Sequence, residues 1–104
     1  MAMRGGKKIS DYQINGCVRR VLSGRSVDLT DIHYRSISGS VDITGRLKFR
    51  EPKSISEVMK ELMILEELIF DIKGVRRVTF NLDDWERANA GGYVRKIETE
   101  EQNN

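Results

Sequence analysis

The sequence has few of the residues on which several kinds of protein chemistry depend. Its 104 residues include one cysteine, one histidine and one proline. A single cysteine excludes an intramolecular disulfide and a zinc site built from several cysteines, and the one histidine adds only one further zinc ligand. The sequence also contains no run of about 18 apolar residues, the length that spans a bilayer. We therefore expect no disulfide, no metal or other cofactor and no transmembrane segment.

Neither sign of charge dominates the chain. Lysine and arginine together number 18, aspartate and glutamate number 16, and the formal net charge is +2. This balance is too even to indicate nucleic-acid or membrane binding from overall charge, so any charged binding surface has to be local. A length of 104 residues allows one modest hydrophobic core, which predicts a single domain.

The N-terminal segment gives a prediction of location. It is basic and contains glycine, but it lacks the apolar stretch of a secretory signal. The sequence as given therefore predicts a cytoplasmic protein, and a periplasmic or envelope location stays open if a leader has been removed. We expect residues 1–9 to form a flexible N-terminus.

Two segments have the pattern of amphipathic helices. Ser10 and Gln13 have the spacing of a capping box, and apolar residues follow them at intervals of three and four. Ser54 and Glu57 repeat this signal before a longer segment of the same periodicity, which Gly74 ends. The sequence predicts one helix over residues 10–23 and a longer one from Ser54 to Gly74.

Three further segments alternate apolar and polar residues, as half-buried strands do. The first lies around Ile32 and Tyr34, the second covers residues 41–49 and the third covers residues 75–82. Residues 38–40, Ser-Gly-Ser, predict a short turn that joins the first two strands as an antiparallel hairpin.

The resulting order, α-β-β-α-β, predicts an α+β fold. One core requires a three-stranded mixed sheet with both helices packed on one face. Gly45 interrupts the apolar face of the second strand, which indicates a bulge or a close approach of the long helix. We expect this domain to cover residues 10–82. Residues 83–104 would form an extension with a short helix at 84–90, stopped by Gly91 and Gly92, and a mobile acidic tail at 98–104.

Two motifs resemble those of a known family. Gly39-Ser40-Val41-Asp42-Ile43-Thr44-Gly45-Arg46-Leu47 resembles the G-x-V-x-L-x-G-x-V hairpin of BON (bacterial OsmY and nodulation) domains. Residues 72–82 resemble the closing v-x-G-V-x-x-V-x-N-x-L motif of the same family. The resemblance implies an αββαβ domain of bacterial envelope or secreted proteins. It also implies a binding module without catalytic activity, for which attachment to phospholipid or protein is proposed.

Basic residues gather near the second predicted strand and suggest an anionic docking strip. Residues at alternate positions of a strand project from one face. The other interpretation is a solvated sheet face whose field is cancelled by neighbouring acidic residues. If the strip binds, its ligand is expected to be an anionic surface, phospholipid headgroups above all. The predicted binding residues are Arg46, Lys48, Arg50 and Lys53, extended by Arg76 and Arg77 at the start of the last strand.

The long helix has a second apolar side, formed by Met59, Met63 and Phe70. We predict that Trp85 or Tyr93 covers it within the chain, which would leave a monomer or a weak homo-oligomer. The alternative is a protein interface in which Met59, Met63, Phe70 and Trp85 contact a partner or a second copy of the chain.

No residues have the spacing of a catalytic site. His33 lies near Asp28 and Asp31, but no serine, cysteine or second base stands at a recognisable catalytic spacing from it. Cys17 belongs to the apolar stripe of the first helix and is interpreted as a buried small hydrophobe. The sequence therefore predicts that the chain is not an enzyme.

Nucleotide and nucleic-acid binding are both disfavoured. The glycines follow no phosphate-binding motif. RNA binding of the KH type requires a G-x-x-G loop between two helices, and the sequence has none. The expected partner is an anionic phospholipid surface or another protein.

Overall fold

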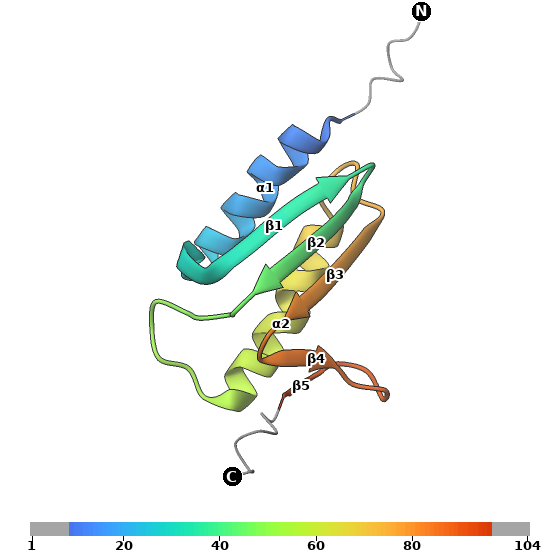
Figure 1. Cartoon of the computed structure of the whole chain (residues 1–104). Helices are drawn as coiled ribbons and strands as arrows, with labels where there is room; N and C mark the ends of the chain where they lie inside the picture. Colours follow the sequence, from blue (N-terminus) through green and yellow to red (C-terminus); the bar gives the residue numbers. More distant parts are fainter. Residues whose placement is uncertain (1–8, 97–104) are drawn as a thin grey trace, which may run out of the picture.

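The computed structural model describes residues 9–96 as two helices packed against one face of a three-stranded sheet, followed by a small hairpin (Figure 1). The predicted flexible N-terminus, apart from Ile9, lies outside the described residues. The predicted mobile tail of residues 98–104 lies outside them as well.

Both helices begin at the predicted capping boxes. Helix α1 covers Asp11–Gly24 and helix α2 covers Ile55–Phe70. The backbone N–H of Gln13 donates to Ser10 Oγ over 3.1 Å, and Gln13 Oε1 accepts from the backbone N–H of Ser10 over 3.0 Å. Ser54 and Glu57 form the same reciprocal pair at α2. The helix starts are thus fixed by contacts between residues three positions apart, each cap contributing about 1 kcal/mol.

The main sheet has the strand order β1-β2-β3. Strand β1 covers Ile32–Ile37, β2 covers Ser40–Gly45 and β3 covers Arg77–Leu82. Strands β1 and β2 pair antiparallel, and β3 pairs parallel to β2 after the α2 crossover. Ser38 and Gly39 both have positive φ, at 50° and 84°, as the tight hairpin turns that match strand twist require. The predicted mixed sheet is confirmed.

The core lies between the sheet and the two helices. Helix α1 contributes one row of buried apolar side chains and α2 contributes a second row, and both rows pack on the same face of the sheet. On the other face, side chains of β1 and β3 are exposed to solvent. The predicted layer arrangement is confirmed. The buried side chains of the two helices are Ile14, Val18 and Leu22 in α1 and Leu62, Leu65 and Ile69 in α2.

An ion pair joins the two helices at one end of the core. Arg25, just after α1, donates from Nε to Glu61 Oε2 over 2.6 Å and from Nη2 to Oε1 over 3.1 Å. Glu61 is buried on α2, and its hydrogen bonds raise the pKa of Arg25. A two-pronged contact of this kind fixes the relative position of its partners better than a single hydrogen bond does.

Strand β2 ends at Gly45, which corrects the predicted extent of the second strand. Gly45 has φ 104°, and a Cβ atom there would lie 2.1 Å from the carbonyl oxygen of Asp31. The close approach therefore comes from the backbone of Asp31 and not, as one alternative predicted, from the long helix. Residues 46–53 leave the sheet as a loop, within which Leu47 is buried and Phe49 forms one isolated bridge with Val27.

The predicted short helix at 84–90 is wrong, because these residues begin a hairpin. Strand β4 covers Trp85–Arg87 and strand β5 covers Tyr93–Arg95, and the two pair antiparallel. Gly91 and Gly92 both have positive φ and reverse the chain between them. Trp85 and Tyr93 are each only 3% exposed and belong to the main core. The hairpin buries both aromatic rings. The predicted helix at 84–90 contains only Trp85, so burial of both rings favours the hairpin.

Candidate functional site

The predicted basic strip does not lie on a strand. Arg46, Lys48 and Arg50 follow the end of β2 and belong to the loop of residues 46–53. Lys48 Nζ pairs with Asp31 Oδ2 over 2.7 Å, and this contact raises the pKa of Lys48. Arg50 donates through Nη2 to the carbonyl oxygen of Ser23 over 2.9 Å. Two of the three side chains therefore hold the loop in place.

Arg76 and Arg77 do not extend the strip. Arg77 pairs with Ser40 at the start of β2, whereas Arg46 follows Gly45 at its other end (Figure 1). Arg76 also donates from Nε to the carbonyl oxygen of Ser38 over 3.1 Å. The structure therefore places the six predicted residues at two opposite ends of the sheet.

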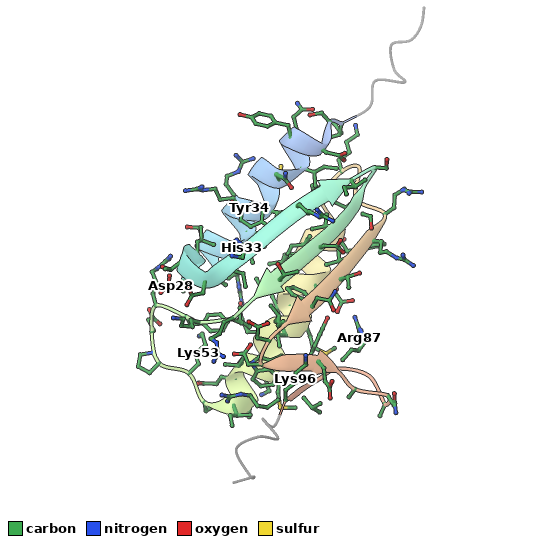
Figure 2. All side chains as sticks on the ribbon, in the orientation of Figure 1. Asp28, His33, Tyr34, Lys53, Arg87 and Lys96 are labelled. Atoms are coloured by element: carbon green, nitrogen blue, oxygen red, sulfur yellow. The ribbon has the colours of Figure 1, made fainter. Side chains whose placement is uncertain are left out.

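A groove of about 300 Å³ lies between the loop of residues 46–53 and α2, beside Lys53, which Figure 2 labels. The Lys53 ammonium lies 5.3 Å from the centroid of the Phe49 ring, and the Arg95 guanidinium lies 5.8 Å from that of Trp85. Arg95 was not among the residues predicted from the sequence. A helix was predicted at 84–90, so strand β5, which contains Arg95, was not expected. The lining combines apolar, basic and acidic side chains: Leu47, Phe49, Ile55, Val58 and Trp85, then Lys48, Lys53 and Arg95, and also Glu51 and Asp84.

The second apolar side of α2 is uncovered within the described residues, so the predicted coverage by Trp85 or Tyr93 is wrong. Met59 is 36% exposed, Met63 51% and Phe70 53%. We call these three residues the α2 flank. Trp85 and Tyr93 do fold back, but their rings enter the core. Trp85 is therefore not available as the interface residue that the sequence suggested.

A cluster of three polar side chains anchors the hairpin to α2. The Tyr93 hydroxyl donates to Glu66 Oε1 over 2.7 Å, and Arg87 pairs with the other oxygen of Glu66. The Arg87 guanidinium also lies 4.9 Å from the centroid of the Tyr93 ring. Burial, together with the bond to Glu66, raises the pKa of Tyr93 above its usual value. Because its members bond mainly to one another, we interpret the cluster as structural.

His33 lies on the uncovered face of the sheet, directly opposite Thr44 (Figure 2). With Arg35, Asp42 and Asn81 it lines a shallow hollow of about 390 Å³. Within residues 9–96, no hydrogen bond joins His33 to a carboxylate, and no group of three histidine, cysteine, aspartate or glutamate side chains is placed to hold a metal ion. This face therefore presents polar groups without an assembled catalytic arrangement.

Comparison with known proteins adds no relative. No family model, curated protein sequence or solved structure matches this chain. The resemblance to BON domains rests on the two sequence motifs and stays a prediction. Neither of the described helices has the length and apolar character of a membrane-spanning segment.

Proposed function

We propose that the chain is a non-catalytic interaction module that associates with a second copy of itself through the α2 flank. One observation carries this proposal: Met59, Met63 and Phe70 stay about one-third to one-half exposed on α2, whose Leu62, Leu65 and Ile69 are fully buried. Contiguous apolar side chains on a surface indicate an interaction site more often than scattered ones do.

The three side chains form a stripe along α2, with Glu66 and Glu67 in the turn between Met63 and Phe70. They stand at intervals of four and seven residues, so the helical turn of roughly 100° per residue keeps them within about 40° of one direction. At about 1.5 Å of rise per residue the stripe is about 16 Å long. Methionine adapts its shape to a facing surface, and phenylalanine supplies a large apolar area, which suits a helix-to-helix contact.

The charges beside the stripe favour a second copy as the occupant. Lys60 and Glu67 lie on either side of Met63 along the helix, and both are exposed. Within residues 9–96 neither forms a salt bridge. When two α2 helices pack antiparallel about a two-fold axis near Met63, Lys60 of each copy lies opposite Glu67 of the other. This pattern is self-complementary, as a two-fold interface requires.

The size of the stripe predicts a weak dimer. Burying the exposed half of a methionine or phenylalanine gains about 1 kcal/mol, so six such side chains gain about 6 kcal/mol. Association costs about 4–15 kcal/mol in lost translational and rotational freedom. The gain therefore suffices only for a dimer whose population depends strongly on protein concentration.

Sedimentation equilibrium between micromolar and millimolar protein tests the proposal. The wild-type chain is expected to shift from monomer to dimer, and the double variant Met63→Glu, Phe70→Glu is expected to stay monomeric. Ile37→Glu is the matched control, because Ile37 is as exposed as Phe70 but lies on the sheet. A wild-type chain that stays monomeric at millimolar concentration overturns the proposal.

Charge exchange tests the antiparallel arrangement. Lys60→Glu and Glu67→Lys are each expected to weaken the dimer, because each places like charges opposite one another. The double exchange is expected to restore wild-type association. A double variant that associates no better than the single ones contradicts this arrangement.

The groove beside Lys53 favours a second candidate function, docking on an anionic phospholipid surface. Lys53 and Arg95 stand beside an apolar lining, whereas Lys48 is already paired with Asp31, so a headgroup phosphate and part of an acyl chain have separate places to bind. Each basic side chain near an anionic membrane contributes about 1 kcal/mol, which alone gives transient attachment. Contact of an acyl chain with the apolar lining would add to this.

Vesicle co-sedimentation at low salt tests the second candidate. Anionic phosphatidylserine-containing vesicles are expected to bind the wild-type chain, and the double variant Lys53→Glu, Arg95→Glu is expected to bind them at least fivefold less. The control variant Arg76→Glu, Arg77→Glu changes two charges at the other end of the sheet. Electrostatic attraction to anionic vesicles is greatest at low salt. If the wild-type chain does not co-sediment with them there, the phospholipid-docking hypothesis is wrong.

A further inference from the structure

Strand β3 is the last strand in the order of the main sheet, and among residues 9–96 no further strand pairs with its outer edge (Figure 1). The backbone N–H groups of Arg77 and Asp83 donate to the carbonyl oxygens of Gly39 and Gly45, at the two ends of β2. Backbone direction alternates along a strand, so the N–H and C=O groups of Val78, Phe80 and Leu82 face away from β2. Within residues 9–96 no group hydrogen-bonds to them.

The two edges of the main sheet have different neighbours. Helix α1 runs alongside β1 (Figure 1). Ser36 of that strand donates to Asn15 of α1 over 2.7 Å, and Asp11 accepts from the backbone N–H of Ser38. Natural proteins blunt exposed edges with proline, lysine, a bulge or a covering segment. The sequence of β3, Arg-Val-Thr-Phe-Asn-Leu, has no proline and no lysine and favours a strand.

A groove of about 360 Å³ follows this edge. Its walls are residues 78–82 of β3 and the β4–β5 hairpin, which lies at the end of β3 (Figure 1). The Tyr93 ring meets the Phe80 ring edge-on with centroids 5.8 Å apart, and this buried contact packs the hairpin against β3 beside the groove. The hairpin residues that line it are Trp85, Glu86, Arg87, Tyr93 and Lys96.

The groove has a basic residue toward each end. Arg77 begins β3 and Lys96 follows β5, and both are exposed. Neither has a salt bridge to another described residue, whereas Arg87 is neutralised by Glu66. Glu86 is the one acidic residue among those that line the groove. A partner with carboxylates spaced along an extended backbone matches this charge distribution.

We propose that the free edge of β3 binds an extended acidic segment of a partner polypeptide as a fourth strand. The backbone of that segment pairs with Val78, Phe80 and Leu82, and its carboxylates lie near Arg77 and Lys96. Recognition by strand addition takes its affinity from main-chain hydrogen bonds and its selectivity from alternate side chains. A second copy of β3 does not fit this site as well, because β3 has no acidic residue. The site is separate from the α2 flank.

Nuclear magnetic resonance of the full chain tests the proposal with a defined probe, a blocked seven-residue peptide in which glutamate alternates with valine. The amide protons of Val78, Phe80 and Leu82 are expected to exchange at least tenfold more slowly at saturation. A peptide with N-methylated alternate residues is expected to bind at least tenfold more weakly, because it lacks the donors. Replacing its glutamates by lysines is expected to weaken binding similarly.

Two variants of the chain separate backbone pairing from charge. Val78→Pro removes an N–H at the free edge without removing a hydrogen bond to β2. This variant is expected to bind the peptide at least fivefold more weakly. Arg77→Glu with Lys96→Glu leaves the edge unchanged and is expected to prefer the lysine peptide. Circular dichroism establishes that each variant is folded, and the charge variant decides the question if the proline variant is not.

Three results would overturn the proposal. The first is equal binding of the N-methylated and unmodified peptides. The second is a set of shifts confined to the α2 flank. The third is protection of the Val78, Phe80 and Leu82 amides before any peptide is added, which would assign the edge to the chain's own residues 97–104 or to a second copy. Dimerisation through the α2 flank can succeed or fail independently of all three.

Discussion

The hydroxyl of Tyr93 donates a 2.7 Å hydrogen bond to Oε1 of Glu66, and this contact joins the β4–β5 hairpin to α2. Replacing Tyr93 by phenylalanine keeps the buried ring and removes the donor. Because it leaves Glu66 with one partner fewer in a partly buried position, we expect Tyr93→Phe to lower the free energy of unfolding by about 1–2 kcal/mol. Urea denaturation measures this. Tyr12→Phe, at an exposed position of α1, is expected to change nothing.

The same tyrosine makes the protein sensitive to alkali. Burial and the bond to Glu66 raise the pKa of Tyr93 in the folded state, whereas a tyrosine in the unfolded chain ionises near pH 10. The contribution of Tyr93 to the free energy of unfolding is therefore fully present below about pH 10. It is lost as the pH rises toward the folded pKa, because only the unfolded chain releases the proton. The stability difference between wild type and Tyr93→Phe is expected to shrink as the pH rises above about 10. A constant difference contradicts this assignment.

Two glycine-to-alanine substitutions are expected to have opposite effects. At Gly45, φ is 104° and the new Cβ would lie 2.1 Å from the carbonyl oxygen of Asp31, so alanine strains the backbone and separates β1 from β2. A loss of at least 3 kcal/mol is expected, in the range of the large single-substitution effects. Gly16 is an exposed residue inside α1, and nothing lies within 4 Å of its Cβ position. Gly16→Ala is expected to stabilise by about 0.5–1 kcal/mol. Thermal unfolding of both variants checks the pair.

Trp85 should contribute more to stability than any exposed residue of its hairpin. Its indole is 3% exposed, so Trp85→Ala leaves a large cavity and is expected to cost about 3–5 kcal/mol. Val94, on the facing strand β5, is exposed, and Val94→Ala is expected to change stability by less than about 0.5 kcal/mol. Equal effects in chemical denaturation would show that the hairpin is not part of the cooperative core.

Local signals were sufficient to predict much of the fold. The capping boxes at Ser10 and Ser54 involve contacts between residues three positions apart, and the periodicity of α1 and α2 follows from the side that each helix buries. The turn at Ser38 and Gly39 separates two alternating segments. Each of these features depends on neighbours in the sequence, so the order α-β-β-α-β and the mixed sheet were predictable.

The candidate sites were less predictable, because accessibility depends on residues distant in sequence. Helical spacing identified the α2 flank, but the sequence could not show that Trp85 would enter the core and leave Met63 and Phe70 uncovered. The basic strip had the alternation of a strand, yet contacts of Lys48 with Asp31 and of Arg50 with Ser23 hold it in a loop. The free edge of β3 had no sequence signal, since pairing is a property of the whole sheet.

The starts of the helices, the turn of the first hairpin and the apolar face of each element depend on contacts within a few residues, so they could be predicted from the sequence. The end of β2 and the element that forms after β3 depend on contacts between distant residues. The carbonyl of Asp31, the residue just before β1, approaches Gly45. The segment after Leu82 becomes a hairpin because the rings of Trp85 and Tyr93 are buried in the main core. In both places a long-range contact outweighs a local preference of about 1 kcal/mol or less per residue.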